Sequence, residues 1–365
     1  MLTEPAQLNR VAPVPGSPAQ MRVLADDLTG ACDAGVAFLD AAHSVRVWFH
    51  PRALFPAPET AQAFHTGSRA MTGEQAAEAV SQMAANLTWD ANTILFKKVD
   101  SAGRGPIAAE VIALHRSLGT KAILLAPAFP AAGRTVNGGI LKVRDACGRC
   151  LSIDLRTWFA PAMQNGIALI SSASEVGAAL DSGKTLLLCD GVTQNDLEEL
   201  ARAAQPLRGL LYAGSAGLAR AIASLHVVSR SAVSTPRSAR TLVITGTQHP
   251  VTTLQLETLE QKTQGREDVR ILRITCEDGD EAKVRAAFAD FDPESLILTG
   301  GDTAQLAAQA LEAHSLLLHG EFEAGIPWGT LQGGIADGRT GVTKSGGFGS
   351  AATLHDIIAK LSGAA

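Results

Sequence analysis

The sequence predicts an α/β protein of two domains, each with a mainly parallel sheet covered by helices, and a cleft between the domains. Three observations carry this prediction. The 365 residues exceed the ~100 to 200 that one domain usually holds. From residue 21 onward, short apolar runs alternate with helical stretches, which is typical of βαβ units. Residues 228–240 lose this periodicity and are rich in Ser, Arg and Pro, as exposed connectors are.

These signals divide the chain into four parts. Residues 1–20 carry four prolines and no apolar segment of a signal peptide, so we expect a disordered leader. The first domain spans residues 21–228, a linker spans residues 229–240, and the second domain spans residues 241–365. Because ligands of open α/β sheets bind beyond the carboxyl ends of the strands, we expect the functional residues at that edge of each sheet.

The elements of the first domain follow in order from its apolar pattern. Each strand is a short apolar run, and each helix is a longer stretch with apolar positions three and four apart. The predicted elements are a strand MRVLA (21–25), a helix GACDAGVAFLDAA (30–42), a strand SVRVWFH (44–50), a helix GEQAAEAVSQMAANL (73–87), a strand NTILFKKVD (92–100), a helix IAAEVIALHRSL (107–118), a strand KAILLAP (121–127), a Gly-rich excursion (130–140), a strand KTLLLCD (184–190) and the helices NDLEELARAA (195–204) and GSAGLARAIASL (214–225).

The second domain repeats the pattern. Its three predicted strands are TLVITGT (241–247), RILRITC (270–276) and SLILTGG (295–301). Helices are expected after the first and the third of them, which makes this domain α/β as well.

Composition and charge exclude several classes of function. Of the residues, 46% are hydrophobic and 18% charged, and no run approaches the ~18 apolar residues of a membrane-spanning helix, so we expect no membrane partner. The net charge of −5 and the lack of a Lys/Arg block argue against a nucleic-acid partner. Five scattered cysteines form no disulfide framework, which favours the reducing cytoplasm. The oligomeric state, a homodimer included, is left open by the sequence.

Two adjacent acids follow the first strand. Asp26 and Asp27 fall in the strand-to-helix turn, and we expect the hydroxyl of Thr29 to cap the helix. One interpretation is a sugar-hydroxyl or magnesium site, in which one acid binds the ligand and the other serves as a base. In the alternative, one acid caps the helix and the other is solvated. The Asp-x-Asp-x-Thr pattern of phosphoaspartate phosphatases is not met, because the two acids are adjacent.

A second polar stretch ends the third predicted strand. Alternation along this strand points Lys98 to one face and Lys97 to the other. Asp100 and Ser101 reach the strand end, and Arg104 precedes the next helix. Lysine, arginine and helix N-terminal amides that converge on one strand end form an anion receptor. The alternative is a surface strand with solvated lysines.

Two further loops of the first domain carry arginines. Arg69 follows an apolar stretch, and on its own it is best interpreted as a solvated loop residue. Residues 127–139 combine two prolines and three glycines with Arg134. Such a composition predicts a rigid, shaped loop in which Arg134 and Asn137 contact a polar ligand.

Three glycine-rich turns of the second domain each follow an apolar run. Gly246 ends the first run, Gly300 and Gly301 join a strand to a helix, and Gly346 and Gly347 lie in the last turn. Glycine lets the backbone approach phosphate oxygens, and a helix N-terminus favours their negative charge. The coincidence of three such turns in one domain predicts a nucleotide site.

Other motifs fail on their context. The DSGKT stretch at residues 181–185 lacks the first glycine of a phosphate-binding loop and precedes a strand, so we interpret it as a helix C-cap. Cys147 and Cys150 have CxxC spacing without a second such pair, so we interpret them as free thiols at a turn. The sequence contains no HExxH motif and no GxGxxG motif after a strand, so it does not support a zinc hydrolase or a nicotinamide dehydrogenase.

Six stretches of the chain carry a resemblance to a known family. They are LADDLTGACDAG (24–35), KKVDSAGRGPIAAE (97–110), PAFPAAGRTVNGGIL (127–141), GSAGLARA (214–221), GGDTA (300–304) and TKSGGFG (343–349). In this order they resemble the four-carbon acid sugar kinases, which include the 3-oxo-tetronate and threonate kinases. The resemblance implies an N-terminal domain that binds the sugar acid and a C-terminal domain that binds ATP. The implied reaction phosphorylates the terminal hydroxyl of a tetronate, with ATP and Mg²⁺ as cofactors.

The resemblance also implies roles for individual positions. The implied substrate-binding residues are Asp26, Asp27, Arg69, Lys98, Asp100, Ser101 and Arg104. The implied nucleotide-binding residues are Gly246, Thr247, Gly300, Gly301, Asp302, Thr303, Gly346 and Gly347. We expect Asp27 to orient or deprotonate the attacking hydroxyl, with Asp26 or Asp100 as substitutes, and Lys98 to neutralise charge across the cleft.

Two other functions stay open beside this kinase. An ATP-independent lyase or epimerase would use the acids and Lys98 on a sugar acid, with purely structural glycine turns. A sugar-acid sensor without catalysis is the other alternative. Its signal is that HTGSR (65–69) and DSAGRG (100–105) stand where the family has DTESR and DSTLRG.

Overall fold

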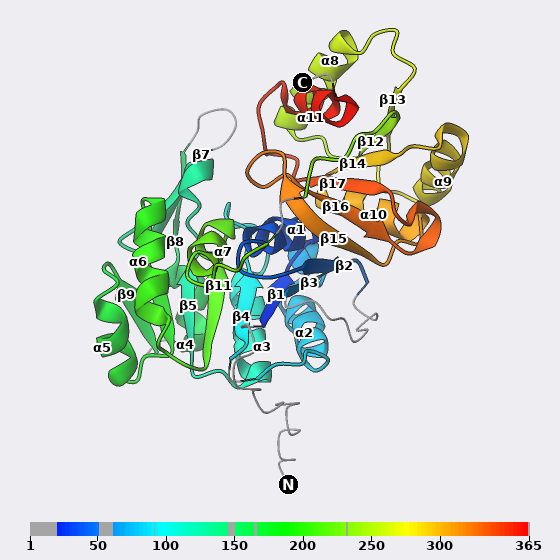
Figure 1. Ribbon diagram of the computed structural model, residues 1–365. Coiled ribbons are helices and arrows are strands. Elements are labelled where there is room, and N and C mark those ends of the chain that lie inside the picture. Colours follow the sequence, from blue (N-terminus) through cyan, green and yellow to red (C-terminus); the bar gives the residue numbers. More distant parts are fainter. Residues whose placement is uncertain are drawn as a thin grey trace.

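The computed structural model describes residues 20–50, 61–90, 92–144, 150–163, 166–230 and 233–363. We call the described residues up to 230 the first half and those from 233 onward the second half. The predicted leader, except for its last residue, and Cys147 lie outside the described residues. In the described parts of the chain, a main sheet of 14 strands runs through both halves, and a sheet of 3 strands projects from the first half (Figure 1).

The main sheet has the strand order β13-β12-β14-β17-β16-β15-β2-β3-β1-β4-β11-β5-β10-β9. Its strands in the first half are β1 (Met21–Ala25), β2 (Val45–Trp48), β3 (Ala61–His65), β4 (Ile94–Lys98), β5 (Ala122–Ala126), β9 (Ile167–Ile170), β10 (Leu186–Cys189) and β11 (Leu210–Gly214). Its strands in the second half are β12 (Thr241–Thr245), β13 (Val269–Arg273), β14 (Ser295–Thr299), β15 (Ser315–Glu321), β16 (Pro327–Gln332) and β17 (Thr340–Lys344). The small antiparallel sheet contains β6 (Arg134–Asn137), β7 (Ile140–Arg144) and β8 (Cys150–Asp154).

Helices pack on both faces of the main sheet. The α-helices are α1 (Leu28–Ala37), α2 (Gly73–Ala84), α3 (Ile107–Leu118), α4 (Arg156–Met163), α5 (Glu175–Asp181), α6 (Gln194–Ala204), α7 (Ala216–Ala223), α8 (Pro250–Lys262), α9 (Asp280–Phe291), α10 (Gly301–Ala310) and α11 (Thr353–Ser362). Within the described residues, the short 3₁₀ helices are η1 (Ser68–Ala70), η2 (Pro130–Ala132) and η3 (Gly334–Ala336). In the first half α2 packs on α3, while α1 packs on α7 and α7 on α6; in the second half α8 packs on α11 and α9 on α10.

The two halves are joined within the main sheet. Strand β2 pairs with β15 in antiparallel register, from Val45 opposite Leu318 to Trp48 opposite Ser315. The pairs β15–β16 and β16–β17 are also antiparallel, whereas the other described pairs of the main sheet are parallel. The prediction of a mainly parallel α/β fold is confirmed. The two sheets that it treated as separate form one.

The twist of this sheet brings the strand ends of both halves together. Because of the three antiparallel pairs, β14 runs opposite to β1 within the sheet. The path between them has six steps, namely β1–β3, β3–β2, β2–β15, β15–β16, β16–β17 and β17–β14. Neighbouring strands rotate by ~20 to 25° per step, so the two strands are rotated by roughly 120 to 150°. A rotation of this size would offset most of the reversal, and residues beyond the strand ends of both halves line one cavity.

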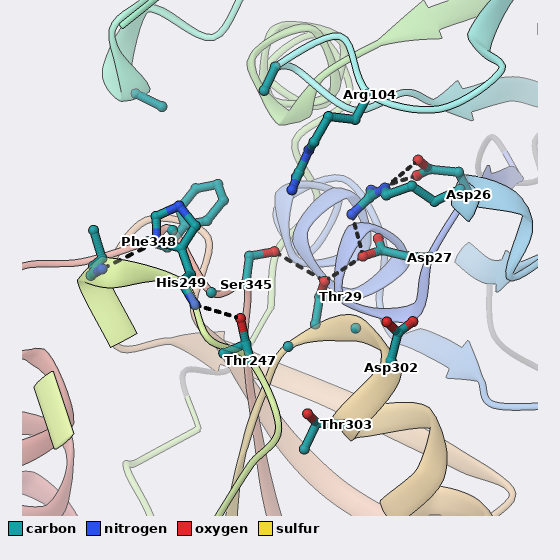
Figure 2. A pocket seen from close by; sticks show the side chains of 18 of the residues that line it. Asp26, Asp27, Thr29, Arg104, Thr247, His249, Asp302, Thr303, Ser345 and Phe348 are labelled. Carbon is teal, nitrogen blue, oxygen red and sulfur yellow. Dashed lines mark hydrogen bonds and ion pairs between the residues drawn. The ribbon is translucent and has the colours of Figure 1, made fainter. Parts of the chain in front are cut away.

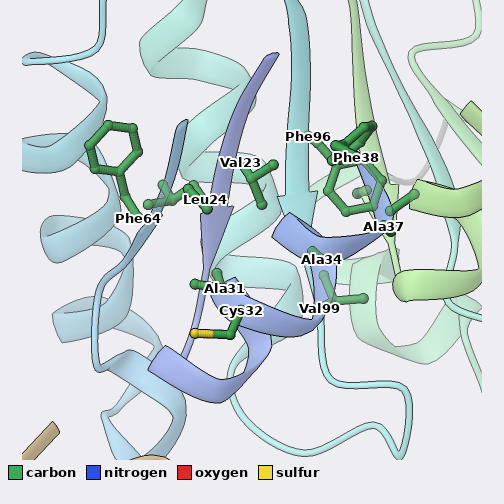
Figure 3. Close-up of a cluster of buried hydrophobic side chains, with 14 of the residues drawn as sticks. Val23, Leu24, Ala31, Cys32, Ala34, Ala37, Phe38, Phe64, Phe96 and Val99 are labelled. Atoms are coloured by element: carbon green, nitrogen blue, oxygen red, sulfur yellow. The ribbon is translucent and has the colours of Figure 1, made fainter. Parts of the chain in front are cut away.

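Helix α1 lies at the centre of the molecule, between the two halves. All of its ten residues are buried, and it contacts β1, β3, α7, α10 and β15. Small residues such as Ala31, Ala34 and Gly35 permit this close packing, and a Cβ on Gly35 would lie 3.1 Å from Leu318 Cδ1 of the second half. Figure 3 shows Ala31, Ala34 and Ala37 of α1 in the apolar cluster. Next to them, the rings of Phe38 and Phe96 pack edge to face, with 5.7 Å between the ring centroids. The N-terminus of α1 is thus fixed relative to both halves.

Several predicted elements need correction. No helix was expected after the second strand of the second half, but α9 follows β13 there. Helix α9 buries Val284, Phe288 and Phe291 at helical spacing. The predicted helix at 214–225 begins only at Ala216, since Gly214 belongs to β11. The strands β3, β9, β11 and β17, the small sheet of β6, β7 and β8, and the antiparallel β15–β16 pair were not predicted. Between α7 and β12, the described residues form neither helix nor strand, as expected for the linker.

Two smaller expectations are confirmed within the described residues. Helix α5 ends at Asp181, with Gly183 at a positive φ of 80°, so the DSGKT stretch is a helix C-terminus. Cys32, Cys150, Cys189 and Cys276 are free thiols, although Cys150 begins β8 and does not lie in the predicted turn. In the part of the chain that the structure describes, no helix combines the length and apolarity needed to cross a membrane.

Candidate active site

A cavity of about 810 Å³ lies where the carboxyl ends of the strands of both halves meet. The first half supplies Asp26, Asp27, Thr29, Gly67, Arg69, Arg104, Phe129 and Arg134 among its lining residues. The second half supplies Gly246, Thr247, His249, Thr275, Cys276, Gly300, Gly301, Asp302, Thr303, Glu323, Ser345, Gly346, Gly347 and Phe348. The predicted position of the site, beyond the strand ends, agrees with this cavity.

The adjacent acids form one wall of the cavity. Asp27 is the N-cap of α1, and its Oδ1 accepts a hydrogen bond of 2.7 Å from the backbone N–H of Gly30. The prediction that Thr29 caps the helix is wrong: Thr29 stands inside the first turn and donates its hydroxyl to Asp27 Oδ2 at 2.9 Å. A carboxylate at the N-cap reaches the free amides of the first turn, which a hydroxyl two residues later cannot do.

Arg69 bridges both acids. Its Nε and Nη2 donate to the two oxygens of Asp26 at 2.7 and 2.9 Å, and its Nη1 donates to Asp27 Oδ2 at 2.6 Å. Although burial alone would raise the pKa of Asp26, the Arg69 guanidinium holds that pKa below its ordinary value. Asp26 is only 1% exposed, so the alternative of one capping and one solvated acid is also wrong. Figure 2 shows the acids directed toward the shared cavity.

A buried polar network positions Arg69. Ser68, in η1, donates its backbone N–H to the carbonyl of Asp26 at 2.9 Å and its hydroxyl to Glu110 Oε1 on α3. The other oxygen of Glu110 lies 3.2 Å from Lys97 Nζ, and the two side chains are 1% and 0% exposed. An ion pair shielded from water in this way ties β4, α3 and the turn that carries Arg69 into one unit.

The lysines of β4 are placed differently from the anion receptor that the sequence predicts. Lys97 and Lys98 do point to opposite faces, toward Glu110 and toward Asp33 of α1 respectively. However, Lys98 does not line the cavity: it is 5% exposed and donates to the carbonyl of Val99 at 3.1 Å. The solvated-lysine alternative is contradicted as well, because both lysines are buried.

Asp100 holds Arg104 at the cavity. Its Oδ2 accepts from Arg104 Nε at 2.9 Å and its Oδ1 from Arg104 Nη2 at 2.7 Å. Although burial alone would raise the pKa of Asp100, hydrogen bonds and charge from Arg104 keep that pKa well below its ordinary value. Arg104 lines the cavity, whereas Asp100 and Ser101 lie behind it. Of the loop at 127–139, Arg134 lines the cavity and Asn137 does not.

The glycine turns of the second half converge, as predicted. A Cβ on Gly300 would lie 3.2 Å from Thr247 Cβ, and a Cβ on Gly346 would lie 2.7 Å from Thr247 Oγ1. Gly246 donates its backbone N–H to Thr303 Oγ1 at 2.9 Å. Gly300 has a φ of 102°, which side-chain-bearing residues rarely adopt. The predicted nucleotide residues therefore form one continuous surface, which lines the cavity.

This surface meets the acids directly. A Cβ on Gly301, the first residue of α10, would lie only 2.6 Å from Asp27 Oδ2. Ser345 donates its hydroxyl to Thr29 Oγ1 at 3.1 Å, so the last glycine turn also contacts the first turn of α1 (Figure 2). The start of α10 has no side-chain cap, which leaves its first backbone N–H groups for a ligand.

Lys344 stabilises the last glycine turn through hydrogen bonds from its ammonium group. Its ammonium donates to Thr252 Oγ1 at 3.1 Å and to the carbonyls of Ser345 and Phe348 at 3.0 and 3.3 Å. Burial lowers the pKa of Lys344 to about 8. Neither this lysine nor the Lys97–Glu110 pair was predicted from the sequence. A signal for the pair exists, because Glu110 falls on the apolar stripe of α3 beside Ile107, Val111 and Leu114.

The chain is similar to known proteins along most of its length. Residues 21–222 match a family model described as a sugar-binding N-terminal domain, and residues 282–354 match one described as a nucleotide-binding C-terminal domain. A Bordetella bronchiseptica protein named D-threonate kinase is 30% identical, over 90% of this chain and 94% of that protein. A Salmonella typhimurium protein of the same name is 28% identical, over 93% of this chain and 97% of that protein. A Heliobacterium modesticaldum protein named D-erythronate kinase is 27% identical over 50% of this chain and 47% of that protein.

Solved structures share the fold. A Salmonella typhimurium protein is similar with a TM-score of 0.72 and 19% identity, over 93% of this chain and 98% of that chain. A Haemophilus influenzae protein is similar with a TM-score of 0.67 and 19% identity, over 94% of this chain and 99% of that chain. At this identity the likeness establishes the arrangement of helices and strands alone.

Proposed function

Because the chain belongs to the four-carbon acid sugar kinase family, we propose that it is an ATP-dependent kinase that phosphorylates the terminal hydroxyl of a four-carbon sugar acid. The observation that carries the proposal is the contact between the halves. The point where a Cβ on Gly301 would lie is 2.6 Å from Asp27 Oδ2, in a cavity that also holds the arginines. An acceptor hydroxyl at Asp27 and a phosphate at the start of α10 would therefore be neighbours.

The second half is the proposed nucleotide site. The start of α10 and the glycine turns at Gly246 and Gly346 offer backbone N–H groups and little steric bulk, which is what polyphosphate binding requires. We place the triphosphate along Gly246, Thr247, residues 300–303 and residues 346–347. Residues 241–365 then form the nucleotide-binding domain, and residues 229–240 the linker.

The first half is the proposed sugar-acid site, in the domain of residues 21–228. Arg104 binds Asp100 through Nε and Nη2, which leaves Nη1 for the carboxylate of the substrate. Figure 2 shows this side chain directed into the cavity. Asp27 is the proposed base, since its Oδ2 faces Gly301 while Asp26 is held on both oxygens by Arg69. Lys98 does not line the cavity, and its proposed role is indirect: its positive charge helps to lower the pKa of Asp26.

Magnesium fits this arrangement through Asp302. Among the described residues no group of three or more His, Cys, Asp or Glu side chains is arranged to hold a metal ion. A nucleotide-bound magnesium needs only one or two carboxylates, since phosphates and water supply the other ligands. Asp302 lines the cavity directly after Gly301 and fits that role. When bound, the ion would neutralise phosphate charge.

The test is an ADP-release assay over a panel of sugar acids. D-Threonate comes first, because the relatives with the longest matches bear that name, followed by L-threonate, the erythronates and 3-oxo-tetronates. We expect ADP release with at least one of them, dependent on magnesium. Calorimetry separates the alternatives: no ATP binding would favour the lyase or epimerase, and binding of both ligands without ADP release would favour the sensor. The cytoplasmic location stays a prediction.

A substitution of Gly301 tests the contact between the halves. Gly301→Ala places a methyl group 2.6 Å from Asp27 Oδ2 without any helix-propensity loss. Because a displacement of ~1 Å of a catalytic group reduces rates by about 10²-fold, we expect turnover to fall by about that factor. Steady-state kinetics measure it. Gly177→Ala in α5, where a Cβ would meet nothing within 4 Å, is the control and should keep full activity. Equal activity of the two variants would contradict the contact.

A further inference from the structure

The arginines of the cavity differ in how their charge is compensated. Arg69 is bound by Asp26 and Asp27, and Arg104 is bound by Asp100. Arg134 makes no ion pair with any described residue; its Nη1 donates to the hydroxyl of Ser101 at 3.2 Å. Its Nε is buried and has no hydrogen-bond partner. A buried donor of this kind carries the full cost of its lost hydration unless a ligand supplies the acceptor.

Arg134 is held firmly at its base. The backbones of Phe129 and Arg134 exchange two hydrogen bonds of 2.8 and 3.1 Å across the turn that contains η2. Gly133, with a φ of 70°, closes this turn directly before Arg134. The side chain therefore starts from a fixed point at the beginning of β6. Burial lowers the pKa of Arg134, which is consistent with a guanidinium removed from water.

The guanidinium lies between the two halves. Its carbon is 5.6 Å from the ring centroid of Phe348, in the last glycine turn of the second half. Phe129 lies beside the same ring at 6.2 Å. Figure 2 shows Phe348 across the cavity from the acids. A positive charge at this place stands beside the last glycine turn, where the triphosphate is proposed to bind.

From this geometry we propose that Arg134 is a further catalytic residue, whose guanidinium contacts the phosphoryl group that passes from the nucleotide to the sugar acid. The inference rests on the proposed function. In that step the bond between the γ-phosphorus and the bridging oxygen breaks, and its electron pair stays on ADP. The hydroxyl oxygen of the sugar acid bonds to the phosphorus, and its proton passes to the Asp27 carboxylate. Charge spreads over the equatorial oxygens, where a planar guanidinium stabilises it.

Arg69 and Arg104 are less suited to this role. Nε, Nη1 and Nη2 of Arg69 each donate to an aspartate, so a phosphoryl group would have to displace a carboxylate. Two nitrogens of Arg104 already donate hydrogen bonds to Asp100. Arg134 keeps an unpaired Nε, and its charge is not cancelled by a described carboxylate. An entering anion therefore gains most at Arg134.

The test compares Arg134→Met and Arg134→Lys with the wild-type protein. In Arg134→Met we expect kcat to fall about 10³-fold, as for other arginines that contact a phosphoryl group in transfer. Calorimetry should give an affinity for ADP within about threefold of wild type and an affinity for the non-hydrolysable analogue AMP-PNP at least ~10-fold weaker, because only the analogue carries the third phosphate. Arg134→Lys should regain part of both losses, since it keeps the charge without the planar fork.

A matched control and the opposing outcomes complete the test. Arg116→Met removes an exposed arginine of α3 outside the cavity and should leave every value unchanged. Turnover of Arg134→Met within about threefold of wild type, or equal losses of affinity for ADP and AMP-PNP, would overturn the role of Arg134. A wild-type protein that releases no ADP with any sugar acid would overturn the kinase assignment instead, and the comparison of AMP-PNP with ADP would still decide on Arg134.

Discussion

Replacing Asp27 with asparagine is expected to lower turnover by about 10³- to 10⁴-fold, near the upper end of what general-base catalysis contributes. The carboxylate is the group that faces Gly301 and the proposed phosphate. Asparagine has the same shape and is as good an N-cap, so α1 should keep its cap on the Gly30 amide. The variant loses the base, the charge partner of Arg69 and the carboxylate oxygen that accepts from the Thr29 hydroxyl. Steady-state kinetics and ADP calorimetry, with affinity unchanged within about threefold, separate chemistry from binding.

Two further variants make this test decisive. Asp40→Asn applies the same change to an exposed residue near the other end of α1 and should be silent. Asp26→Asn should raise the KM for the sugar acid more than it lowers kcat, because Asp26 orients Arg69 instead of facing the reacting atoms. Wild-type turnover in Asp27→Asn would exclude Asp27 from the chemistry. A smaller loss in Asp27→Asn than in Asp26→Asn would reverse the roles of the two acids.

Removal of Glu110 should give the largest loss of stability. Glu110→Ala leaves Lys97, which is 0% exposed, as a buried charge without its carboxylate, and it takes away the acceptor of the Ser68 hydroxyl. Breaking a buried ion pair from one side costs about 3 to 5 kcal/mol, so we expect the free energy of unfolding to fall by that amount. Urea unfolding followed by circular dichroism measures it.

The double variant tests the cause. Lys97→Met combined with Glu110→Leu removes both charges and fills similar volume, so it should recover most of the stability that Glu110→Ala loses. Its activity should nevertheless fall below that of the wild-type protein, because the Ser68 hydroxyl loses its acceptor beside the turn of Arg69. A single variant that loses less than about 1 kcal/mol would show that water or another group replaces the ion pair.

The sequence predicted best those features that depend on local pattern. The acids at the end of β1 and the glycines at Gly246, Gly300 and Gly346 were located by the change from an apolar run to a turn, and the structure brings them into one cavity. The predicted fold class depends on the same pattern and is confirmed. What each residue binds within the cavity stays a proposal.

The features that were missed depend on contacts distant in the sequence. Alternation along β4 predicts that Lys97 and Lys98 point to opposite faces of the sheet. It does not predict that α1 covers Lys98 and keeps it out of the cavity. The sequence placed Thr29 as the cap, since hydroxyl residues are common caps, whereas the acid before the helix fills that position. The pairing of β2 with β15 joins segments more than 260 residues apart, and no local signal encodes it.

The pairing of β2 with β15 has a mechanical consequence. Two lobes that hang on a linker can swing apart as rigid bodies, but these two share backbone hydrogen bonds, and Arg46 of β2 reinforces the seam by donating to Ser315 Oγ at 2.9 Å. We therefore expect a substrate to be admitted by twisting of the continuous sheet, because the shared strands oppose a rigid-body hinge between the halves. Because the orientation of the acids relative to the glycine turns depends on strand twist, a few degrees of torsion at this seam would change the separation of donor and acceptor along the whole cavity.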